Sequence, residues 1–375
     1  FSPDGQTLAV GYHDSLRVDL LEASTLRLQS SADTQSLSGG NLMSVAFLPL
    51  ARSGASARLA AGGRHIVSGE CPIFAWEKEG QGSRSAWPGP QSTVMDLAPL
   101  PDGSLAFSSG DSAWGVLDPQ GHRSVFLGPP LADLRGKLFE HFTVSAEGTR
   151  VRFGLEEWSG TPVLFDLKSR NLLESPDPVS DLAPPETEAL PIQNWINDTS
   201  PTLKDQSARG LRSLIRGQSK PLALQPYETS RSLAIAPDAA SFVLGTEWRL
   251  RRYDAAGSSL WEQPVPGIVW GVNLAREGRL ILAAYGDGTM RWHRAEDGAE
   301  LLALFIHLPE GPQGPRHRIL FTPDGYYDAS SPEAHSLVGW HINRGPEEAA
   351  DFYPVETFAS TYHKPDRVLA ALDGV

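Results

Sequence analysis

Hydrophobic and polar residues alternate along this chain in short stretches that recur around one turn phrase. An apolar strand of period two leads into Pro-Asp-Gly, or a degenerate copy of it, and a second strand follows. The copies are FSPDGQTLAV (1–10), PLPDGSLAFS (99–108), VSAEGTRVRF (144–153), IAPDAASFVL (235–244), LAREGRLILA (274–283) and FTPDGYYDAS (321–330). An internal repeat of this kind predicts a repeat architecture built from β-strands.

The spacing of the repeats narrows the architecture. The reference residue of each copy is the one in the Pro position, namely Pro3, Pro49, Pro101, Ala146, Pro237, Arg276 and Pro323. The successive spacings are 46, 52, 45, 91, 39 and 47 residues. Five of these six lie near the roughly 40–45 residues of a four-stranded propeller blade.

The strand before each turn predicts how the sheets pack. The residues four and two positions before the reference residue are mostly large and apolar, and the residue between them is mostly small. Period-two alternation places the two large positions on one face of a sheet. Such sheets bury both faces when they stack radially. We therefore predict an all-β fold, a β-propeller of about seven four-stranded blades, the first of them incomplete because Phe1 follows most of an innermost strand.

The long interval between the fourth and fifth copies reads differently. It contains SPDPVSDLAPPETEALP at 175–191, which is rich in Pro and Asp and has little strand pattern. Such a composition is typical of a loop. The sequence predicts a loop insertion at about 173–226, and the alternative is a degenerate extra blade in the interval 172–226.

The pattern changes again at the C-terminus. Pro346 precedes EEAADF, and Pro365 precedes DRVLAAL. Proline followed by acidic residues is a helix-entry signal. We expect two short helices here, so that residues 1–345 form the propeller and residues 346–375 form a helical tail.

The phrases FSPDGQTLAVG and YGDGTMRW resemble the WD-repeat family. From about Tyr227 to Leu372 the chain also resembles a class of large bacterial proteins, over stretches such as FVLGTEWRLRRYD and AAYGDGTMRWHRAEDGAELLALF. In that class a WD-repeat propeller precedes a caspase-like (clan CD) peptidase domain. The resemblance implies a sensing or scaffolding propeller that positions or restrains a peptidase. The peptidase domain itself is absent from this sequence, and the tail would be its connector.

Composition excludes some partners. The formal net charge of −13 argues against a nucleic-acid partner, because phosphate binding needs clustered Lys and Arg. No apolar run reaches the roughly 18 residues of a membrane span. Cys71 is the single cysteine, so no intramolecular disulfide can form. That fits a reducing compartment, and we expect a cytoplasmic protein.

Motifs of catalysis are missing from the sequence. It has no GxSxG nucleophile elbow, no GxxxxGK[ST] phosphate loop and too few cysteines for structural zinc. Two features leave alternatives open. Asp324, Asp328, His335 and His341 could bind a transition metal or could simply cap turns and end strands. Cys71 could be a redox sensor or an inert, half-buried thiol. We expect no enzyme, no catalytic residue, no cofactor and no metal in this chain.

One set of positions varies where the rest of the repeat agrees. Six residues before the reference residue, at the predicted start of each innermost strand, stand Met43, Met95, Glu140, Arg231, Trp270 and His317. In a propeller this position lies near one mouth of the central channel, so we predict that these residues bind a protein partner; the alternative is that they are solvated strand starts. At the level of function, the alternatives are a propeller that binds a small molecule or hydrolyses a substrate in its channel, and a purely structural spacer.

Overall fold

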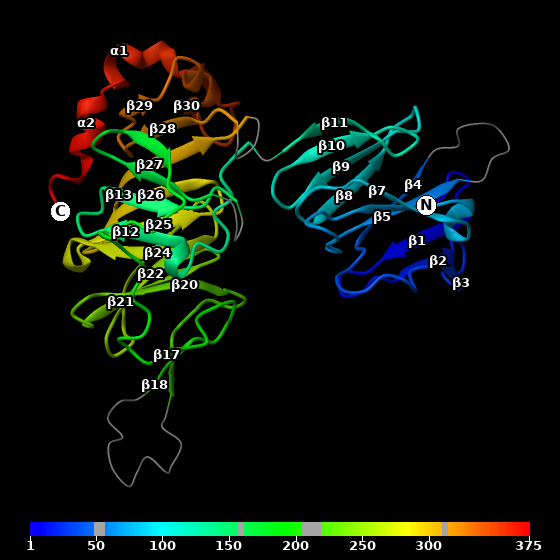
Figure 1. The fold of residues 1–375 in the computed structure, drawn as a ribbon, viewed down its shortest axis with the longest axis horizontal. Coiled ribbons are helices and arrows are strands. Elements are labelled where there is room, and N and C mark those ends of the chain that lie inside the picture. Colours follow the sequence, from blue (N-terminus) through cyan, green and yellow to red (C-terminus); the bar gives the residue numbers. More distant parts are fainter. Residues whose placement is uncertain (49–56, 129, 157–160, 205–218, 310–313) are drawn as a thin grey trace, which may run out of the picture. The chain divides into compact units, whose positions relative to one another are not determined.

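The computed structural model describes residues 1–48, 57–128, 130–156, 161–204, 219–309 and 314–375. Pro49, one of the repeat reference residues, lies outside them. The fold is all-β, with antiparallel sheets and only short helices, as predicted. The chain forms two compact units, which Figure 1 draws in blue to cyan and in green to red. Unit 1 contains Phe1–Pro130, and unit 2 contains Leu131–Leu308 and the described residues after 313.

The described residues of unit 1 form three sheets, and the strands of each follow one another in sequence order. The first sheet contains β1 (Thr7–Gly11), β2 (Val18–Glu22) and β3 (Leu28–Ser31). The second contains β4 (Ser44–Leu48), β5 (Arg58–Gly62), β6 (Ile73–Trp76) and β7 (Arg84–Trp87). The third contains β8 (Val94–Pro99), β9 (Leu105–Ser109), β10 (Trp114–Leu117) and β11 (Arg123–Leu127).

The turn phrase of the repeat makes each first hairpin. In the copy at 99–108, Gly103 has φ +87°, a left-handed conformation that glycine adopts without steric cost. The Asp102 side chain accepts a hydrogen bond from the Ser104 backbone N–H at 3.0 Å, which closes the turn. The sequence therefore specifies this turn locally, and the strand pair β8–β9 follows from it.

Consecutive sheets of unit 1 pack through their apolar faces. One buried cluster joins Leu20 of the first sheet to Leu59 and Trp76 of the second. Another joins Ile73 of the second sheet to Phe107 of the third. Neighbours in sequence are thus neighbours in space, as the repeat predicts.

The described residues of unit 2 form five sheets. The first has the order β15-β14-β13-β12-β16, from β12 (Phe142–Ser145), β13 (Arg150–Phe153), β14 (Val163–Asp166), β15 (Asn171–Glu174) and β16 (Leu182–Ala183). The second sheet contains β17 (Ile192–Gln193), β18 (Thr202–Lys204) and β19 (Ser219–Pro221), and the third contains β20 (Ser230–Ile235), β21 (Ser241–Thr246), β22 (Arg249–Asp254) and β23 (Ser259–Pro264). The fourth contains β24 (Val269–Ala275), β25 (Leu280–Tyr285), β26 (Thr289–Arg294), β27 (Glu300–His307), β28 (His317–Phe321) and β29 (Tyr327–Ala329). The fifth is the pair β30 (Gly339–Ile342) and β31 (Asp351–Pro354).

The sheets of unit 2 do not stack in sequence order. Alternate residues of β25 face opposite sides: Leu282 packs with Phe153 of the sheet β12–β16, whereas Ile281 packs with Val243 of the sheet β20–β23. Asn273 on β24 also donates to the backbone oxygen of Phe142 at 3.0 Å. The sheet β24–β29 is therefore sandwiched between sheets that begin about 130 and about 40 residues before it.

Two predictions about the repeat need correction here. The interval 173–226 is not wholly a loop, because it holds the three-stranded sheet β17–β19, with residues 205–218 outside the described part. The last copy, FTPDGYYDAS, does not begin a blade of its own. Its strands β28 and β29 extend the sheet of β24–β27 to six strands, since β27 pairs with β28 through Phe305 and Ile319.

The helices are short and lie mostly at the C-terminus. Among the described residues the α-helices are α1 (Ala359–Tyr362) and α2 (Pro365–Leu369). The 3₁₀ helices there are η1 (Lys78–Gly80), η2 (Phe139–His141), η4 (Arg276–Gly278), η5 (Glu333–Leu337), η6 (Val355–Phe358) and η7 (Ala370–Leu372). The predicted helix at Pro365 is present. The prediction of a helix after Pro346 is wrong, because residues 351–354 form β31 instead. Val368 and Leu372 are buried in the core of unit 2, so the tail is docked on that unit. Among the described residues no helix is long and apolar enough to cross a membrane.

Candidate protein-interaction surface

The structure distributes the six predicted partner-binding positions over both units. They lie as follows: Met43 just before β4, Met95 on β8, Glu140 in η2, Arg231 on β20, Trp270 on β24 and His317 on β28. Of these, the structure brings Arg231 and Trp270 together, with the guanidinium carbon 5.2 Å from the indole centroid. The first two positions are in unit 1 and the other four are in unit 2.

His317 does not occupy an innermost strand. It begins β28, which is added outside β27, and its ring stacks on that of His307 at 6.2 Å. Its Nδ1 lies 3.1 Å from the Ser331 hydroxyl. The extension of the sheet therefore separates His317 from the equivalent positions Arg231 and Trp270.

Arg231 is held by contacts from three directions. Its guanidinium donates to the Asn197 side-chain oxygen and to the Glu247 carboxylate, and it covers the Trp270 ring. A guanidinium over an indole face contributes about 0.5–1 kcal/mol where the site is exposed. These contacts join the segment before β18, the turn after β21 and the start of β24.

The segments that make this contact carry further aromatic side chains, since Trp248 follows Glu247 and Tyr227 is four residues before Arg231. Tyr227 is 88% exposed and Trp248 is 45% exposed. The centroids of the Phe139 and Trp195 rings are 5.9 Å apart in an edge-to-face arrangement. Trp195 is two residues before Asn197, which contacts Arg231. We call the six residues Phe139, Trp195, Tyr227, Arg231, Trp248 and Trp270 the aromatic surface.

Backbone hydrogen bonds connect the segments that carry the aromatic surface. The Asn197 N–H donates to the Ser230 oxygen at 2.9 Å, and the Glu247 N–H donates to the Thr229 oxygen at 3.1 Å. The Val265 N–H donates to the Trp248 oxygen at 3.2 Å. Loops that are tied in this way lose little conformational entropy when a partner binds.

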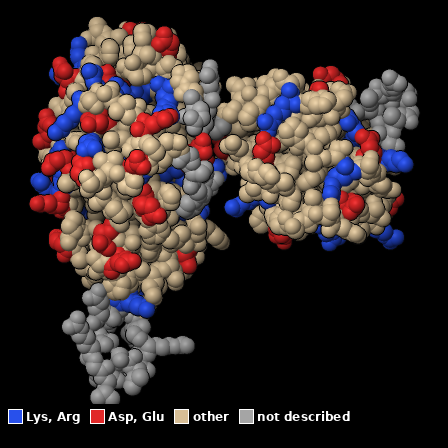
Figure 2. All heavy atoms as spheres, in the orientation of Figure 1, with Lys and Arg blue, Asp and Glu red and all other residues tan. Residues whose placement is uncertain are grey.

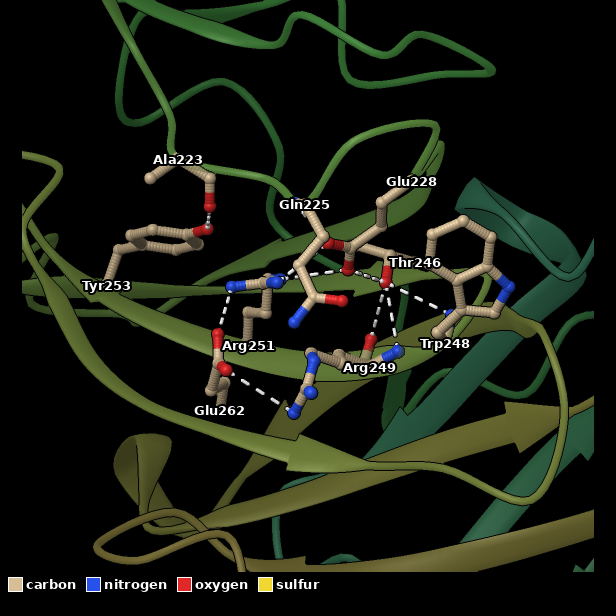
Figure 3. Close-up of polar contacts among 9 residues, drawn as sticks. All are labelled: Ala223, Gln225, Glu228, Thr246, Trp248, Arg249, Arg251, Tyr253 and Glu262. Atoms are coloured by element: carbon tan, nitrogen blue, oxygen red, sulfur yellow. Dashed lines mark hydrogen bonds and ion pairs between the residues drawn. The ribbon is translucent and has the colours of Figure 1, made fainter.

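A buried ion pair, Glu228 with Arg251, lies close to Trp248 (Figure 3), and Glu228 directly follows Tyr227 in the chain. Glu228 and Arg251 make two contacts, Nε to Oε1 at 2.9 Å and Nη2 to Oε2 at 2.7 Å. The Thr246 hydroxyl also donates to Glu228, and the Gln225 N–H donates to Glu228 Oε2 at 2.7 Å. Because Glu228 is fully buried, these bonds hold the segment around Tyr227 in one position.

The electrostatics of this pair favour its charged form. Burial acts to raise the pKa of Glu228, but the bonds from Arg251 and Thr246 outweigh it and hold the pKa below its usual range. Burial likewise acts to lower the pKa of Arg251, and its bond to Glu228 outweighs burial and raises it. Both groups stay ionised, and Glu262 on β23 supplies a second carboxylate to Arg251.

Thr246 also orders the turn that presents Trp248. Its hydroxyl oxygen accepts from the Arg249 N–H at 3.0 Å, and it donates to Glu228. One side chain therefore links the exposed turn 246–249 to the buried carboxylate (Figure 3).

Sequence reasoning missed Glu228 and Tyr227. Glu228 contacts Arg251 across 23 positions, so no local spacing reveals the pair. Tyr227 has φ +66°, which is uncommon for a residue with a side chain, but no residue type in PYETS signals it.

The structure does not favour the metal site or the redox-active thiol that the sequence left open. Asp328 forms ion pairs with Arg318 at 2.9 Å and Arg170 at 3.3 Å. Within the described residues no group of three or more His, Cys, Asp or Glu is arranged to hold a metal ion. Cys71 is a buried free thiol, and burial raises its pKa, which disfavours the reactive thiolate.

Surface charge does not single out a partner. Figure 2 shows Asp and Glu interspersed with Lys and Arg on the face that it draws, with no continuous patch of one sign over either unit. Recognition by a strong single-sign field is therefore not supported on that face. The aromatic surface remains the candidate with a defined geometry.

Comparisons with known proteins were made on sequence and on structure. No family model and no curated protein matches the chain. A solved structure titled "Structure of U3-55K" is similar at 16% sequence identity and a TM-score of 0.27, and the match covers 76% of this chain and 72% of that one. A TM-score this low carries no argument about the fold or the function of this chain.

Proposed function

We propose that this chain is a non-catalytic protein-interaction module built on a β-propeller of the WD-repeat type. The support for the propeller is the repeated phrase, the antiparallel meanders and their face-to-face stacking. The observation that carries the function is the aromatic surface. Tyr227 and Trp248 are exposed aromatic side chains on segments anchored by a buried ion pair, and such aromatic residues dominate protein interfaces.

We further propose that the partner is a caspase-like peptidase domain, in the same polypeptide or associated with it, which this module positions or restrains. The support is the resemblance from about Tyr227 to Leu372. The docked tail adds to it, because Val368 and Leu372 pack into the core of unit 2 and Arg276 donates to the Val375 backbone oxygen at 2.9 Å. A segment attached in this way transmits the position of unit 2 to whatever follows it.

A titration of the 375-residue chain with a caspase-like peptidase domain of this class tests the proposal. The double variant Arg231→Glu with Trp270→Ala removes the cation–π contact and places a like charge beside Glu247, and we expect at least about tenfold weaker binding. Tyr227→Ser is the cleaner variant, since this exposed side chain contributes little to stability, and about threefold to tenfold weaker binding is expected.

Trp114→Ala on β10 is the matched control, because it removes a similarly exposed tryptophan from unit 1. It should leave the affinity unchanged. Equal affinities for the wild type, Tyr227→Ser and the double variant would contradict the proposed surface. No binding by the wild type would contradict the proposed peptidase partner.

A further inference from the structure

A pocket of about 340 Å³ lies at one end of the sheet β12–β16, within unit 2. Its lining comes from the end of η2 (His141), the start of β12 (Thr143), the end of β13 (Arg152) and the segment up to the start of β16 (Val179, Leu182), together with Lys137. The volume is at the lower end of the range for pockets that bind small molecules.

The pocket is preformed, because the segment 175–182 is tied to the sheet at several points. Arg152 donates from Nε to the Ser175 oxygen and from Nη2 to the Pro176 oxygen, both at 2.9 Å. Arg150 donates to the Asp181 carboxylate at 2.5 Å. The segment then pairs with β12, Ser145 opposite Leu182. Little ordering is therefore needed when a ligand enters.

Arg152 places a positive charge in the lining. Its Nε and Nη2 donate to neutral carbonyls, and its Nη1 makes no hydrogen bond within the described part of the chain. The Lys137 side chain is buried, and its Nζ donates to the Glu156 backbone oxygen at 2.6 Å. Among the described lining residues Glu140 is the one acidic side chain, and it is exposed. The Arg152 guanidinium can still donate from Nη1, which favours an anionic ligand.

Further groups define the rest of the ligand. Thr143 lines the pocket, and among the described residues its hydroxyl has no hydrogen-bond partner. The opposite part of the lining is apolar and stiff, with Pro162, Pro176 and Pro178 beside Val179 and Leu182. A ligand that fits has an anionic end and a small apolar body.

We propose that this pocket binds a small carboxylate with an apolar side chain, its carboxylate at Arg152 and Thr143 and its apolar body against the proline-rich segment. A free acid of this type and the carboxyl end of a peptide share the chemistry. The site is separate from the aromatic surface in its residues, and it does not depend on the proposed protein partner.

The test uses N-acetyl-leucine and N-acetyl-leucinamide as probes, titrated into the 375-residue chain by calorimetry. The two differ only in the charge of the carboxyl end, so the acid should bind at least about tenfold more tightly than the amide. A tetrapeptide that ends in leucine with a free carboxylate distinguishes the two sources: affinity equal to or above that of N-acetyl-leucine indicates a peptide end, and loss of binding indicates a free acid.

Variants of Arg150 and Arg152, both on β13, distinguish the charge of Arg152 in the pocket from its bonds to the segment 175–182. Arg152→Gln removes the guanidinium from the pocket, and we expect at least about tenfold weaker binding of the acid. Arg150→Gln releases the same segment at Asp181 without changing the lining, and it should change the affinity less than about twofold. Thr143→Val, which keeps the shape of the side chain, should weaken binding about threefold to tenfold.

Three results would overturn the proposal. One is that N-acetyl-leucine does not bind at millimolar concentration. Another is that the acid and the amide bind equally. The third is that Arg150→Gln and Arg152→Gln reduce the affinity equally, which would mean that Arg152 acts only by holding the segment.

Discussion

Arg251 and Arg291 occupy the same position in neighbouring sheets of unit 2. Each is the third residue of the third strand, β22 and β26, and each lies opposite the matching residue of the second strand, Leu244 and Ala283. Each forms two ion pairs with carboxylates. They differ in burial, since the side chain of Arg251 is 4% exposed and that of Arg291 is 15% exposed.

The origin of the acidic partners explains the difference. Arg291 pairs with Asp287, four residues earlier in its own turn, and with Glu300 on the next strand. Arg251 pairs with Glu228, which belongs to the segment that precedes its sheet. A local pair closes a turn, whereas the distant pair fixes an incoming segment and with it Tyr227. The same repeat position thus closes a local turn in one sheet and anchors a distant segment in the other.

The largest effect is expected for Glu228→Gln. This change leaves Arg251 buried with only Glu262 as a charged partner, and breaking a buried pair typically costs about 3–5 kcal/mol. The measurement is hydrogen exchange of the amides in β20–β23, which reports the free energy of local opening without assuming that both units unfold together.

The double variant Glu228→Gln with Arg251→Met tests the cause. Replacing both members of a buried pair by groups of similar volume is often neutral or stabilising, so most of the lost free energy should return. A cost below about 1 kcal/mol for Glu228→Gln alone would show that the pair is solvated and does not fix the segment.

The sequence predicts the parts of this structure that depend on neighbouring residues. Alternation and the turn at Asp102 and Gly103 specify strand pairs, and the hydrophobic faces specify that sheets stack. The choice of stacking partner is not local. The sheet β12–β16 packs on β24–β29 through contacts such as Trp292 Nε1 to the Gly148 oxygen at 2.7 Å, across 144 positions, which no repeat phrase encodes.

The candidate site divides in the same way. Arg231 and Trp270 could be predicted because they fall at equivalent points of the repeat on adjacent sheets. Glu228 could not, because its function depends on an arginine of a later strand. For the last repeat copy the sequence predicted the wrong position in the fold. Its local pattern is that of the first hairpin of a blade, but β28 pairs with β27 and so extends the preceding sheet.

A second prediction concerns the fifth position of the same two strands, Tyr253 and His293. Burial lowers the pKa of His293 from 6.5 to about 4, so the native state stays neutral where the unfolded chain takes up a proton. Stability is therefore complete above about pH 6.5 and falls as the pH drops toward 4, by about 2 kcal/mol between pH 7 and pH 5. Burial raises the pKa of Tyr253, so it stays neutral over this range.

Hydrogen exchange of the amides in β24–β27, corrected for the intrinsic pH dependence, measures this effect. His293→Gln removes the titrating group while keeping a side chain that can bond to Tyr285, now 2.8 Å from His293 Nε2. The variant should lose most of the slope between pH 7 and pH 5. An unchanged slope would assign the pH dependence to another group. That group would not be Glu228, because the stability that its lowered pKa provides is lost only below its usual pKa of about 4.3.

The smallest effect is expected for Asp287→Asn, the counterpart of Glu228→Gln at Arg291. An asparagine oxygen can still accept from the Thr289 N–H and hydroxyl, now at 2.9 and 2.6 Å, and Arg291 keeps Glu300. The variant loses one partly exposed ion pair, which lowers the free energy of unfolding by about 0.2–1 kcal/mol. Exchange of the β24–β27 amides should show this cost at low salt and much less of it at 1 M salt, because salt screens exposed charges. If Asp287→Asn instead costs as much as Glu228→Gln, then burial and the distant origin of the acid do not distinguish the two arginines, and the segment at Tyr227 has no special anchor.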